Sequence, residues 1–430
     1  MTSGSEEPRP SRWRLLSGLL GNSALRAATI ATKSALIFAL AAWLEPEELG
    51  HYGLIAAIVA LTNTIYGLDF HTFVVRDISL ANLGDARRKL RDQFTFHGVL
   101  YLLAAFVLAW WVPALGLSAD LVPLVVLVTV FQHATQELYR VLVRLLRVFE
   151  ASVVFFVRDA GWIPLIFLKW WITGSLDLLE ILAFWLGGSL VATAFAIVCL
   201  VRRTPKGVAA PPDWAWLRKG LRVGLRMLPG TLSLRSLFSV DRMLLAVLVL
   251  PDTLGAYVFF TGLCMAFYGL FESGVLPYYW PELLEAEKSE DPARIALARR
   301  RLTQVCWLGL LGIVLASGVA GWVATHLLDK PVYSQNLDLL PILGLAYGFL
   351  AAGYAPHYML FAKGRDHLIV GSQLAGLAAL GLVTLIAAQL SARLAVPSAV
   401  LVAGLLMLVA KWVLARRLGL GGGGPVVAPE

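Results

Sequence analysis

Long apolar runs, separated by short polar segments, follow one another along nearly the whole chain. Each run contains roughly the 20 helical residues that are needed to cross the hydrocarbon core of a bilayer, or more. The runs are apolar all round, whereas the strands of a transmembrane barrel alternate apolar and polar residues, so we expect helices. The pattern predicts twelve spans, at residues 19–44, 50–75, 94–112, 121–139, 151–173, 178–201, 223–250, 254–276, 302–328, 337–361, 368–390 and 395–418.

The composition agrees with this pattern. Of 430 residues, 58% are hydrophobic and 15% are charged, and the mean hydropathy is +0.74, whereas a typical soluble domain has about 25% charged residues. The three cysteines, Cys199, Cys264 and Cys306, lie within apolar runs and show no CxxC spacing, so they predict neither a disulfide nor a metal site. We therefore predict an all-α polytopic membrane protein without a cofactor.

The basic residues separate by side, as the positive-inside rule expects. The opposite loops hold only Lys330 and Arg393, with Lys169 near a helix end. We therefore predict an inner-membrane protein with both termini in the cytoplasm. These clusters account for the net charge of +8, so nucleic acid is not an expected partner. The basic clusters of the inner side lie at residues 9–14, 76–91, 140–147, 202–222, 288–301, 363–365 and 416–417.

Three segments outside the spans have their own interpretation. Residues 1–18 are predicted to be a cytoplasmic N-terminal segment, because polar residues interrupt the apolar run that follows and no clear cleavage site is present. Residues 419–430 are rich in Gly and Pro and are predicted to be a disordered tail. The inner loop at 281–301 is predicted to contain an amphipathic helix on the membrane surface, with Leu283 and Leu297 on its apolar face.

The sequence contains an internal repeat. Pro46-Glu-Glu-Leu-Gly-His-Tyr52 matches Pro251-Asp-Thr-Leu-Gly-Ala-Tyr257, 205 residues later, and Gly21-Asn-Ser-Ala-Leu-Arg26 matches Gly230-Thr-Leu-Ser-Leu-Arg235 at an offset of 209. The chain is thus predicted to form two six-helix halves, 19–201 and 223–418, joined by a cytoplasmic linker at 202–222. Because each half has an even number of helices, both have the same orientation, and the substrate site is expected in a central cavity between them.

The chain resembles the multidrug/oligosaccharidyl-lipid/polysaccharide exporter superfamily and, within it, the bacterial polysaccharide-repeat flippases. The residues that carry the resemblance are Leu44-Glu-Pro-Glu-Glu-Leu-Gly-His-Tyr-Gly-Leu54, Gly67-Leu-Asp-Phe70, Arg76-Asp77, Asp241-Arg242 and Leu254-Gly-Ala-Tyr257. Peptidoglycan-precursor flippases of the superfamily usually have two further helices, which the twelve predicted spans lack. Its drug exporters usually have fewer cations inside their helices.

The resemblance implies a carrier that works by alternating access. Its expected substrate is an undecaprenyl-diphosphate-linked oligosaccharide, which it moves from the cytoplasmic to the periplasmic leaflet for surface polysaccharide biosynthesis. The lipid bilayer and this lipid-linked substrate are therefore the expected partners, and polysaccharide polymerase or ligase machinery is a further candidate. No signature in the sequence specifies the sugar.

Four cations inside the predicted helices are candidates for binding the diphosphate. Arg26 and Lys33 are seven residues apart, as are Arg235 and Arg242, so each pair lies on one helix face two turns apart. The offset of 209 aligns the two pairs, and a charge inside a span costs about 2.5–3.5 kcal/mol on insertion scales, which favours a functional reason for it. The alternative is structural pairing with buried carboxylates such as Asp69, Asp159 or Glu272.

Several ionisable residues inside the predicted spans could couple transport to an ion gradient. Asp241 is the first candidate because it lies deep in its span beside Arg242, and Asp69, Asp159 and Glu272 are further candidates. His133 and Glu137 share a helix face at i,i+4, and we interpret them as a hydrogen-bonded pair near the inner interface.

Three rival functions differ from the flippase in class. A membrane glycosyltransferase or polymerase would need acidic residues in a substantial loop, and the predicted outer loops are short with no Asp-x-Asp motif. A drug or small-cation exporter of the same superfamily would share the fold without using a lipid-linked sugar. A membrane assembly factor would need no transport site. We predict a transporter and not an enzyme.

Overall fold

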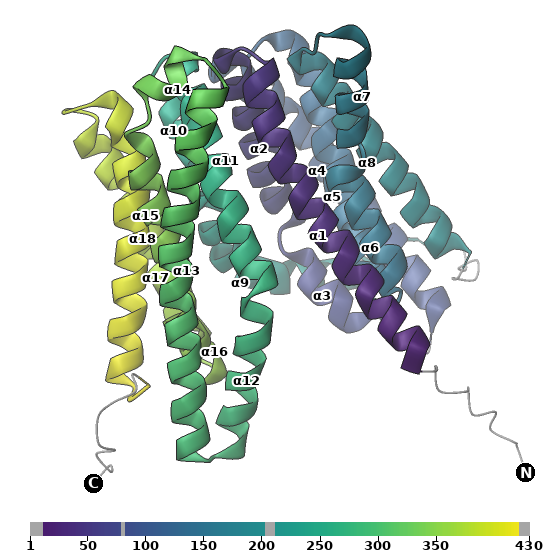
Figure 1. The fold of residues 1–430 in the computed structure, drawn as a ribbon. Coiled ribbons are helices and arrows are strands. Elements are labelled where there is room, and N and C mark those ends of the chain that lie inside the picture. The colour runs from purple at the N-terminus through teal and green to yellow at the C-terminus, as the bar shows by residue number, and fades with distance from the viewer. Residues whose placement is uncertain (1–11, 79–81, 203–210, 421–430) are drawn as a thin grey trace, which may run out of the picture.

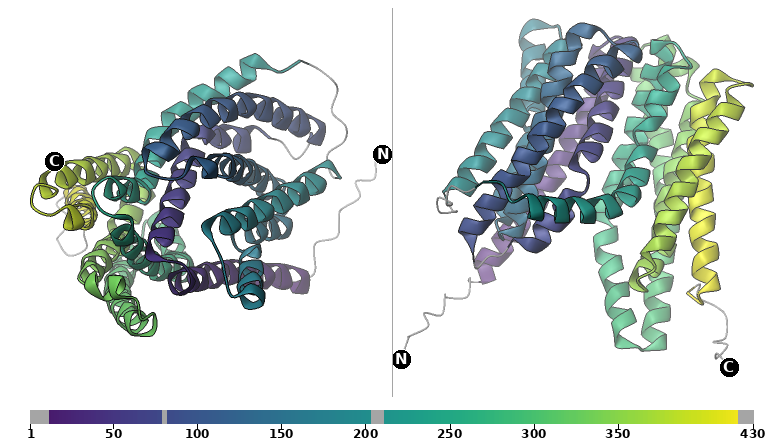
Figure 2. Two further views of the ribbon diagram at one scale, coloured as in Figure 1. Left: turned by 90° about the horizontal axis from the view of Figure 1, so that it is seen from above. Right: turned by 180° about the vertical axis from the view of Figure 1, so that it is seen from behind.

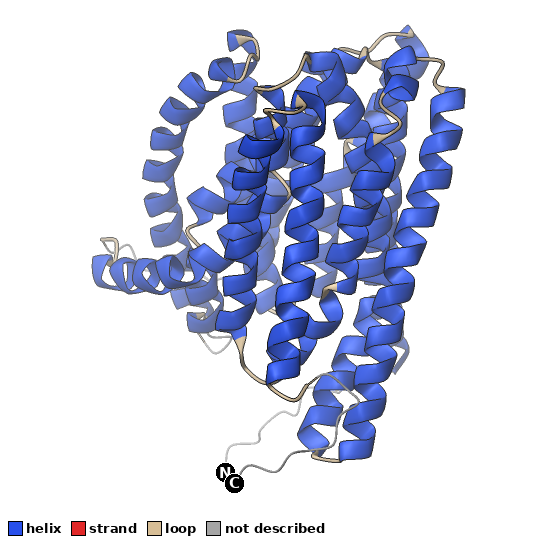
Figure 3. Cartoon of the chain, turned by 90° about the vertical axis from the view of Figure 1, so that its left-hand side faces the viewer, coloured by secondary structure: helices blue, strands red, loops and turns tan. Residues whose placement is uncertain are grey.

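The computed structural model describes residues 12–78, 82–202 and 211–420, and these form helices joined by turns and short loops, with no strand among them (Figure 3). The structure thus confirms the predicted all-α class. The first eight helices are α1 (Arg12–Trp43), α2 (Pro46–Gly67), α3 (Phe70–Asp77), α4 (Leu83–Ala114), α5 (Val122–Arg144), α6 (Val148–Phe156), α7 (Ile163–Thr173) and α8 (Leu178–Val201), with the short elements η1 (Ala119–Leu121) and η2 (Val157–Gly161).

The remaining helices follow the linker. They are α9 (Trp214–Leu237), α10 (Val240–Ala246), α11 (Pro251–Gly274), α12 (Leu276–Ser289), α13 (Pro292–Leu327), α14 (Pro331–Gln335), α15 (Leu339–Ala352), α16 (Tyr354–Ala362), α17 (Asp366–Ala387) and α18 (Ala392–Arg417). Within the described residues, eleven helical segments are long and apolar enough to span a membrane.

The predicted seventh span, 223–250, is not the continuous apolar helix that we expected. Its polypeptide forms α9 and α10, which are separated at Phe238 and Ser239. The helix α9 has Pro229 in its interior and a low mean hydropathy caused by its basic residues. It runs across the lower end of the molecule and then turns upward (Figure 2), and a proline inside a helix is a common cause of such a bend.

Several other spans are interrupted within the apolar run that predicted them. The helices α2 and α3 are separated by Leu68 and Asp69, both left-handed, with φ of 44° and 50°. The fifth span consists of α6, η2 and α7, in which η2 is a single π-helical turn. The tenth is divided into α15 and α16 at Gly353. Only α8 coincides with its predicted limits, 178–201.

The inner loop at 281–301 is helical, but it does not form the predicted surface helix. The helix α12 continues from the end of α11, and α13 begins at Pro292 and returns beside it, so that the two form a hairpin extending past the lower end of the bundle (Figure 1). Leu283 is fully buried, whereas Leu297, the other residue of the predicted apolar face, is 49% exposed. The predicted apolar face is therefore divided between the interior of the hairpin and its surface.

The helices form two groups, α1–α8 and α9–α18, that approach each other at the upper end and diverge toward the lower end (Figures 1 and 2). The exception is the first half of α9, which packs against α3 and the preceding break through Gly220 and Gly224. At the upper end, α2 crosses α11 at the glycines of the repeated motif. A Cβ atom added to Gly50 would lie 2.8 Å from the Pro251 carbonyl oxygen, and one added to Gly255 would overlap the Pro46 carbonyl oxygen. The matched motifs thus allow backbone contact between the two groups.

We predict that Gly255→Val destabilises the protein, because the added side chain would meet backbone atoms that cannot move aside. Overpacking of this kind costs about 1–3 kcal/mol, so the midpoint of thermal unfolding in detergent should fall. Gly187→Val is the matched control, since a Cβ at Gly187 of α8 has no neighbour within 4 Å. Equal unfolding midpoints for the two variants would contradict this interpretation of the crossing.

Candidate functional site

A cavity of about 690 Å³ lies between the two groups of helices. Its walls come from α1, α2, α5 and η2 on one side and from α9, α10 and α11 on the other. Five cationic side chains line it against two carboxylates, giving a formal net charge of +3 with His71 neutral. The cations are Lys33, Arg140, Arg158, Arg235 and Arg242, and the carboxylates are Asp69 and Asp159.

The structure brings three of the four predicted cations to this cavity. Lys33 lines the first wall, and Arg235 and Arg242 line the second. Arg26 is exposed on α1 and is not among the lining residues. Lys33 lies on the side of α1 that faces the cavity, and Arg26 lies beyond the lining because the cavity reaches only from Ile30 to Ile37 along this helix.

The first wall holds an acidic residue between two cations. The Arg158 Nε and Nη2 atoms donate hydrogen bonds to the two Asp159 carboxylate oxygens, at 2.7 and 3.3 Å. The Lys33 ammonium lies 3.7 Å from Asp159 Oδ2, and its side chain is still 56% exposed. The π-turn η2 directs both members of the adjacent Arg158–Asp159 pair to the cavity. Lys33 is therefore a cation with most of its hydrogen-bonding capacity free.

The second wall has a different arrangement. The Arg242 Nη1 atom donates a hydrogen bond of 2.7 Å to the Phe238 carbonyl oxygen and lies 3.7 Å from Asp241 Oδ1. Asp241 is buried behind the wall, where the Tyr257 hydroxyl donates to its Oδ2 at 2.7 Å. Arg235 is exposed and has no ion-pair partner within the described part of the chain. This wall therefore presents one oriented and one free guanidinium.

The remaining predicted carboxylates lie at different depths. Asp69 is buried at the α2–α3 break and lines the cavity, with its Oδ1 atom 3.8 Å from His71 Nδ1. Glu272 of α11 is exposed and lies outside the cavity lining, where its Oε1 atom accepts a hydrogen bond of 2.5 Å from Tyr354. Neither Asp241 nor Glu272 therefore reaches the cavity directly.

His133 and Glu137 share a face of α5 as predicted, with 3.7 Å between His133 Nε2 and Glu137 Oε1. Both are buried within the first group of helices, and His133 Nε2 has no hydrogen-bond partner, so the interpretation of the two residues as a hydrogen-bonded pair is wrong. The Gln93 amide donates to Glu137 Oε2 at 2.7 Å, and His97 stacks edge-on against His133. Sequence reasoning missed Gln93 and His97, although their i,i+4 spacing at the start of an apolar run is a signal that could have identified them.

No protein-family model and no curated protein matches the chain. Solved structures do match. An inward-facing MATE family multidrug resistance transporter of the MOP superfamily has a TM-score of 0.65 and 14% identity, over 91% of this chain and 94% of that one. The lipid II flippase MurJ in an inward closed conformation has a TM-score of 0.68 and 12% identity, over 92% and 87%.

The MATE multidrug transporter DinF-BH has a TM-score of 0.57 and 14% identity, over 96% of this chain and 98% of that one. The chain therefore has the fold of the MOP-superfamily transporters and is a multi-pass membrane protein. The fold is common to drug transporters and a lipid flippase, so it does not choose between these substrates.

We predict that Asp159→Ala destabilises the protein, because it leaves the nearly buried Arg158 guanidinium without its counter-ion. Removing one partner of a buried ion pair costs about 3–5 kcal/mol, and the side chains of Arg158 and Asp159 are only 10% and 13% exposed. The double variant Arg158→Met, Asp159→Leu should recover the unfolding midpoint. Asp252→Ala, at an exposed position, is the control. Unchanged stability of Asp159→Ala would contradict structural pairing.

Proposed function

We propose that the protein is a flippase that moves undecaprenyl-diphosphate-linked oligosaccharides across the bacterial inner membrane for surface polysaccharide biosynthesis. The observation that carries this proposal is the cavity between the two groups of helices, with its formal charge of +3 and cations on both walls. A diphosphate carries about two negative charges, and Arg and Lys donors form strong charge-assisted hydrogen bonds with its oxygens.

The contacts of the cations suit this ligand. Lys33 on one wall and Arg235 on the other have donors that are not committed to a carboxylate at close range. The Arg242 Nη1 atom donates to the Phe238 carbonyl oxygen, which fixes the position of the guanidinium. The Arg242 Nη2 atom donates to the Met265 sulfur, at 3.3 Å. A diphosphate between the walls would replace this weak contact by charge-assisted hydrogen bonds, so binding there would be favoured.

Alternating access gives the cavity a route to both leaflets. The two groups of helices are in backbone contact at the upper end, at Gly50 and Gly255, and diverge at the lower end (Figure 1). Rocking about the cavity would separate the upper contact and bring the lower ends together. The predicted halves, 19–201 and 223–418, are the bodies that we propose to move.

The alternative function is a drug or small-cation exporter, and the MATE neighbours share this fold. The charge of the cavity favours an anionic ligand, because a cationic drug would be repelled by a net charge of +3 in a site of low dielectric constant. A glycosyltransferase or polymerase is disfavoured for another reason. The carboxylates at the cavity, Asp69 and Asp159, face a histidine and two cations, and Asp159 is committed to its ion pairs.

We predict that Lys33→Ala and Arg242→Ala each lower the flipping rate, measured as transbilayer movement of a lipid-diphosphate sugar in proteoliposomes. Losing a charge-assisted hydrogen bond costs about 1.5–3 kcal/mol, which is roughly a 10-fold to 100-fold change. Lys33→Arg should retain part of the activity. Arg26→Ala, outside the cavity lining, should have a smaller effect than Lys33→Ala.

Lys288→Ala, at an exposed cation on α12, is the matched control for charge removal and should transport normally. The amount of monodisperse protein must be measured for every variant, because structural pairing predicts that activity falls only with the amount of protein. Normal flipping by a well-folded Lys33→Ala, Arg242→Ala protein would refute the diphosphate site. Drug efflux by the wild type without lipid movement would instead establish the alternative function.

We also propose that the lower end of the molecule faces the cytoplasm, together with both termini, and that polysaccharide polymerase or ligase machinery acts on the product. The described chain begins with α1 and ends with α18 at this lower end (Figure 1). A C-terminal reporter that is active only in the cytoplasm should therefore be active, and one inserted at Lys330 should be inactive. The opposite result would reverse the orientation.

A further inference from the structure

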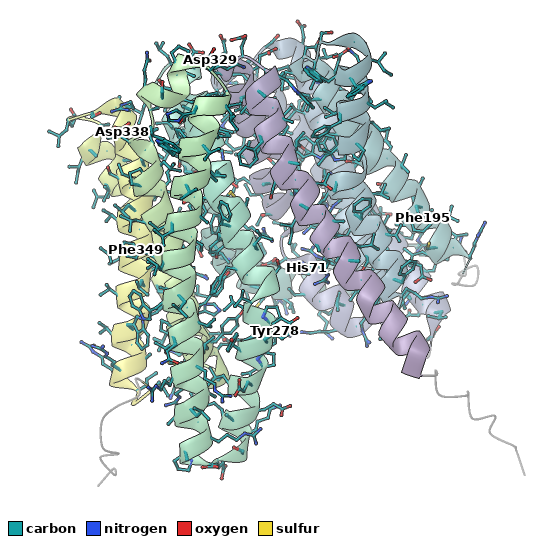
Figure 4. All side chains as sticks on the ribbon, viewed as in Figure 1. His71, Phe195, Tyr278, Asp329, Asp338 and Phe349 are labelled. Carbon is teal, nitrogen blue, oxygen red and sulfur yellow. The ribbon has the colours of Figure 1, made fainter. Side chains whose placement is uncertain are left out.

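A second polar site lies within the first group of helices, behind the cavity wall. It is formed where α4 and α5 pack against the α2–α3 break. His97 is 0% exposed, His133 is 1% exposed and Glu137 is 2% exposed. His71 connects this region to the cavity, which it lines, and it lies between the two groups of helices (Figure 4). We call His71, His97 and His133, with Asp69 and Glu137, the histidine cluster.

Glu137 is fully engaged within this cluster. The Gln93 amide nitrogen donates to its Oε2 at 2.7 Å, and Arg140 Nη1 donates to its Oε1. His133 Nδ1 lies 2.8 Å from the Tyr101 hydroxyl, whereas His133 Nε2 lies 3.7 Å from Glu137 Oε1. The carboxylate favours a proton on Nε2, so that Tyr101 donates to Nδ1 when the imidazole is neutral.

Five other polar atoms of the cluster have no hydrogen-bond partner among the described residues. Both ring nitrogens of His97 are buried without a partner, as are His133 Nε2, His71 Nδ1 and Asp69 Oδ2. More than about 90% of buried polar groups in proteins are hydrogen-bonded, so several unsatisfied atoms at one place call for an explanation. Four of these five atoms belong to imidazoles, and imidazole is the side chain whose ordinary pKa lies near neutral pH.

With neutral histidines, the cluster and the adjacent Arg140 together carry one net negative charge. Asp69 and Glu137 carry two negative charges and Arg140 carries one positive charge. The α2–α3 segment contributes Asp69 and His71, and α4 contributes His97 and Tyr101. The helix α5 contributes His133, Glu137 and Arg140. The helix α9 meets the segment through Gly224 and Trp216, which do not titrate, and through Lys219, whose ammonium lies 5.9 Å from the centre of the Phe73 ring. One added proton makes this buried site neutral.

We propose that the histidine cluster is a proton-binding site that takes up one proton and couples transport to the proton gradient. The proton enters from the cavity at His71 and is held on His133, whose Nδ1 then donates to Tyr101 while Glu137 stabilises the imidazolium. The ring centroids of His97 and His133 are 4.8 Å apart, so repulsion between two imidazolium ions limits uptake to one proton.

The cluster is linked to the second group of helices by the backbone of the α2–α3 break. A Cβ atom on Gly67, which precedes the break, would lie 3.2 Å from His133 Nε2. On the other side of the break, a Cβ atom on Gly224 of α9 would overlap the Leu68 carbonyl oxygen. The break is thus held between the imidazole and α9. Neutralising the cluster stabilises this contact, and removing the proton leaves a buried negative charge that favours separation.

The test needs no lipid-linked sugar, so its failure is distinct from failure of the proposed flippase. Spin labels on cysteines placed at Leu146 and Tyr278, which are 71% and 78% exposed on the two groups of helices, report the width of the lower end in the purified full chain. The half-buried Cys199 is replaced beforehand. We expect the distance distribution to change with pH through a single one-proton transition, and a pH indicator to record uptake of one proton per protein.

His133→Asn should abolish both the transition and the uptake. Glu137→Gln keeps a hydrogen-bonding side chain but loses the charge that stabilises the imidazolium, so it should move the transition to lower pH. His326→Asn, at an exposed histidine on α13, is the matched control and should behave as the wild type. A wild type without a transition, or a folded His133→Asn protein with an unchanged transition and uptake, would overturn the proposal. Uptake of two protons would overturn the one-proton limit.

Discussion

The free energy of a charge in hydrocarbon is the constraint on which the polar parts of this protein depend. An ionised side chain in a membrane span must find a counter-ion, a backbone carbonyl or an aqueous cavity. Arg158 meets Asp159, Arg242 meets the Phe238 carbonyl, and Lys33 and Arg235 face the cavity. The cavity thus collects cations from both groups of helices, because it is where their charge can be solvated.

Apolar runs predicted where helices cross the membrane much better than where those helices break. A run of apolar residues remains continuous in sequence whether its backbone turns or not, so the left-handed Leu68 and Asp69 and the division at Gly353 left no signal in hydropathy. The limits of α8 were predictable because Asp177 and Glu180 form a capping box at its start and Arg202 follows its end. Local chemistry of this kind marks helix termini and is absent from interior breaks.

Helical spacing predicted which faces carry cations, and the structure supplied their depth and their partners. Lys33 and Arg242 reach the cavity, whereas Arg26, two turns from Lys33 on the same face, lies beyond its lining. The π-turn η2 sets the direction of Arg158, and a spacing argument based on a regular α-helix cannot anticipate it. The contacts of Gln93 with Glu137 and of His97 with His133 depend on how α4 packs against α5. The sequence of one span does not specify how it packs against another, so these contacts were not predictable.

Two polar sites with opposite net charge lie next to each other, and they share Asp69, His71 and Arg140, which line the cavity. The cavity has an excess of positive charge suited to an anionic ligand, and the histidine cluster behind it has an excess of negative charge suited to a proton. Asp69 belongs to both, because it lines the cavity and faces His71 at the α2–α3 break. A proton that compensates Asp69 from within the cluster leaves the cavity more positive, and an anion in the cavity then makes uptake of that proton more favourable. Such linkage is reciprocal, so each ligand would strengthen the binding of the other.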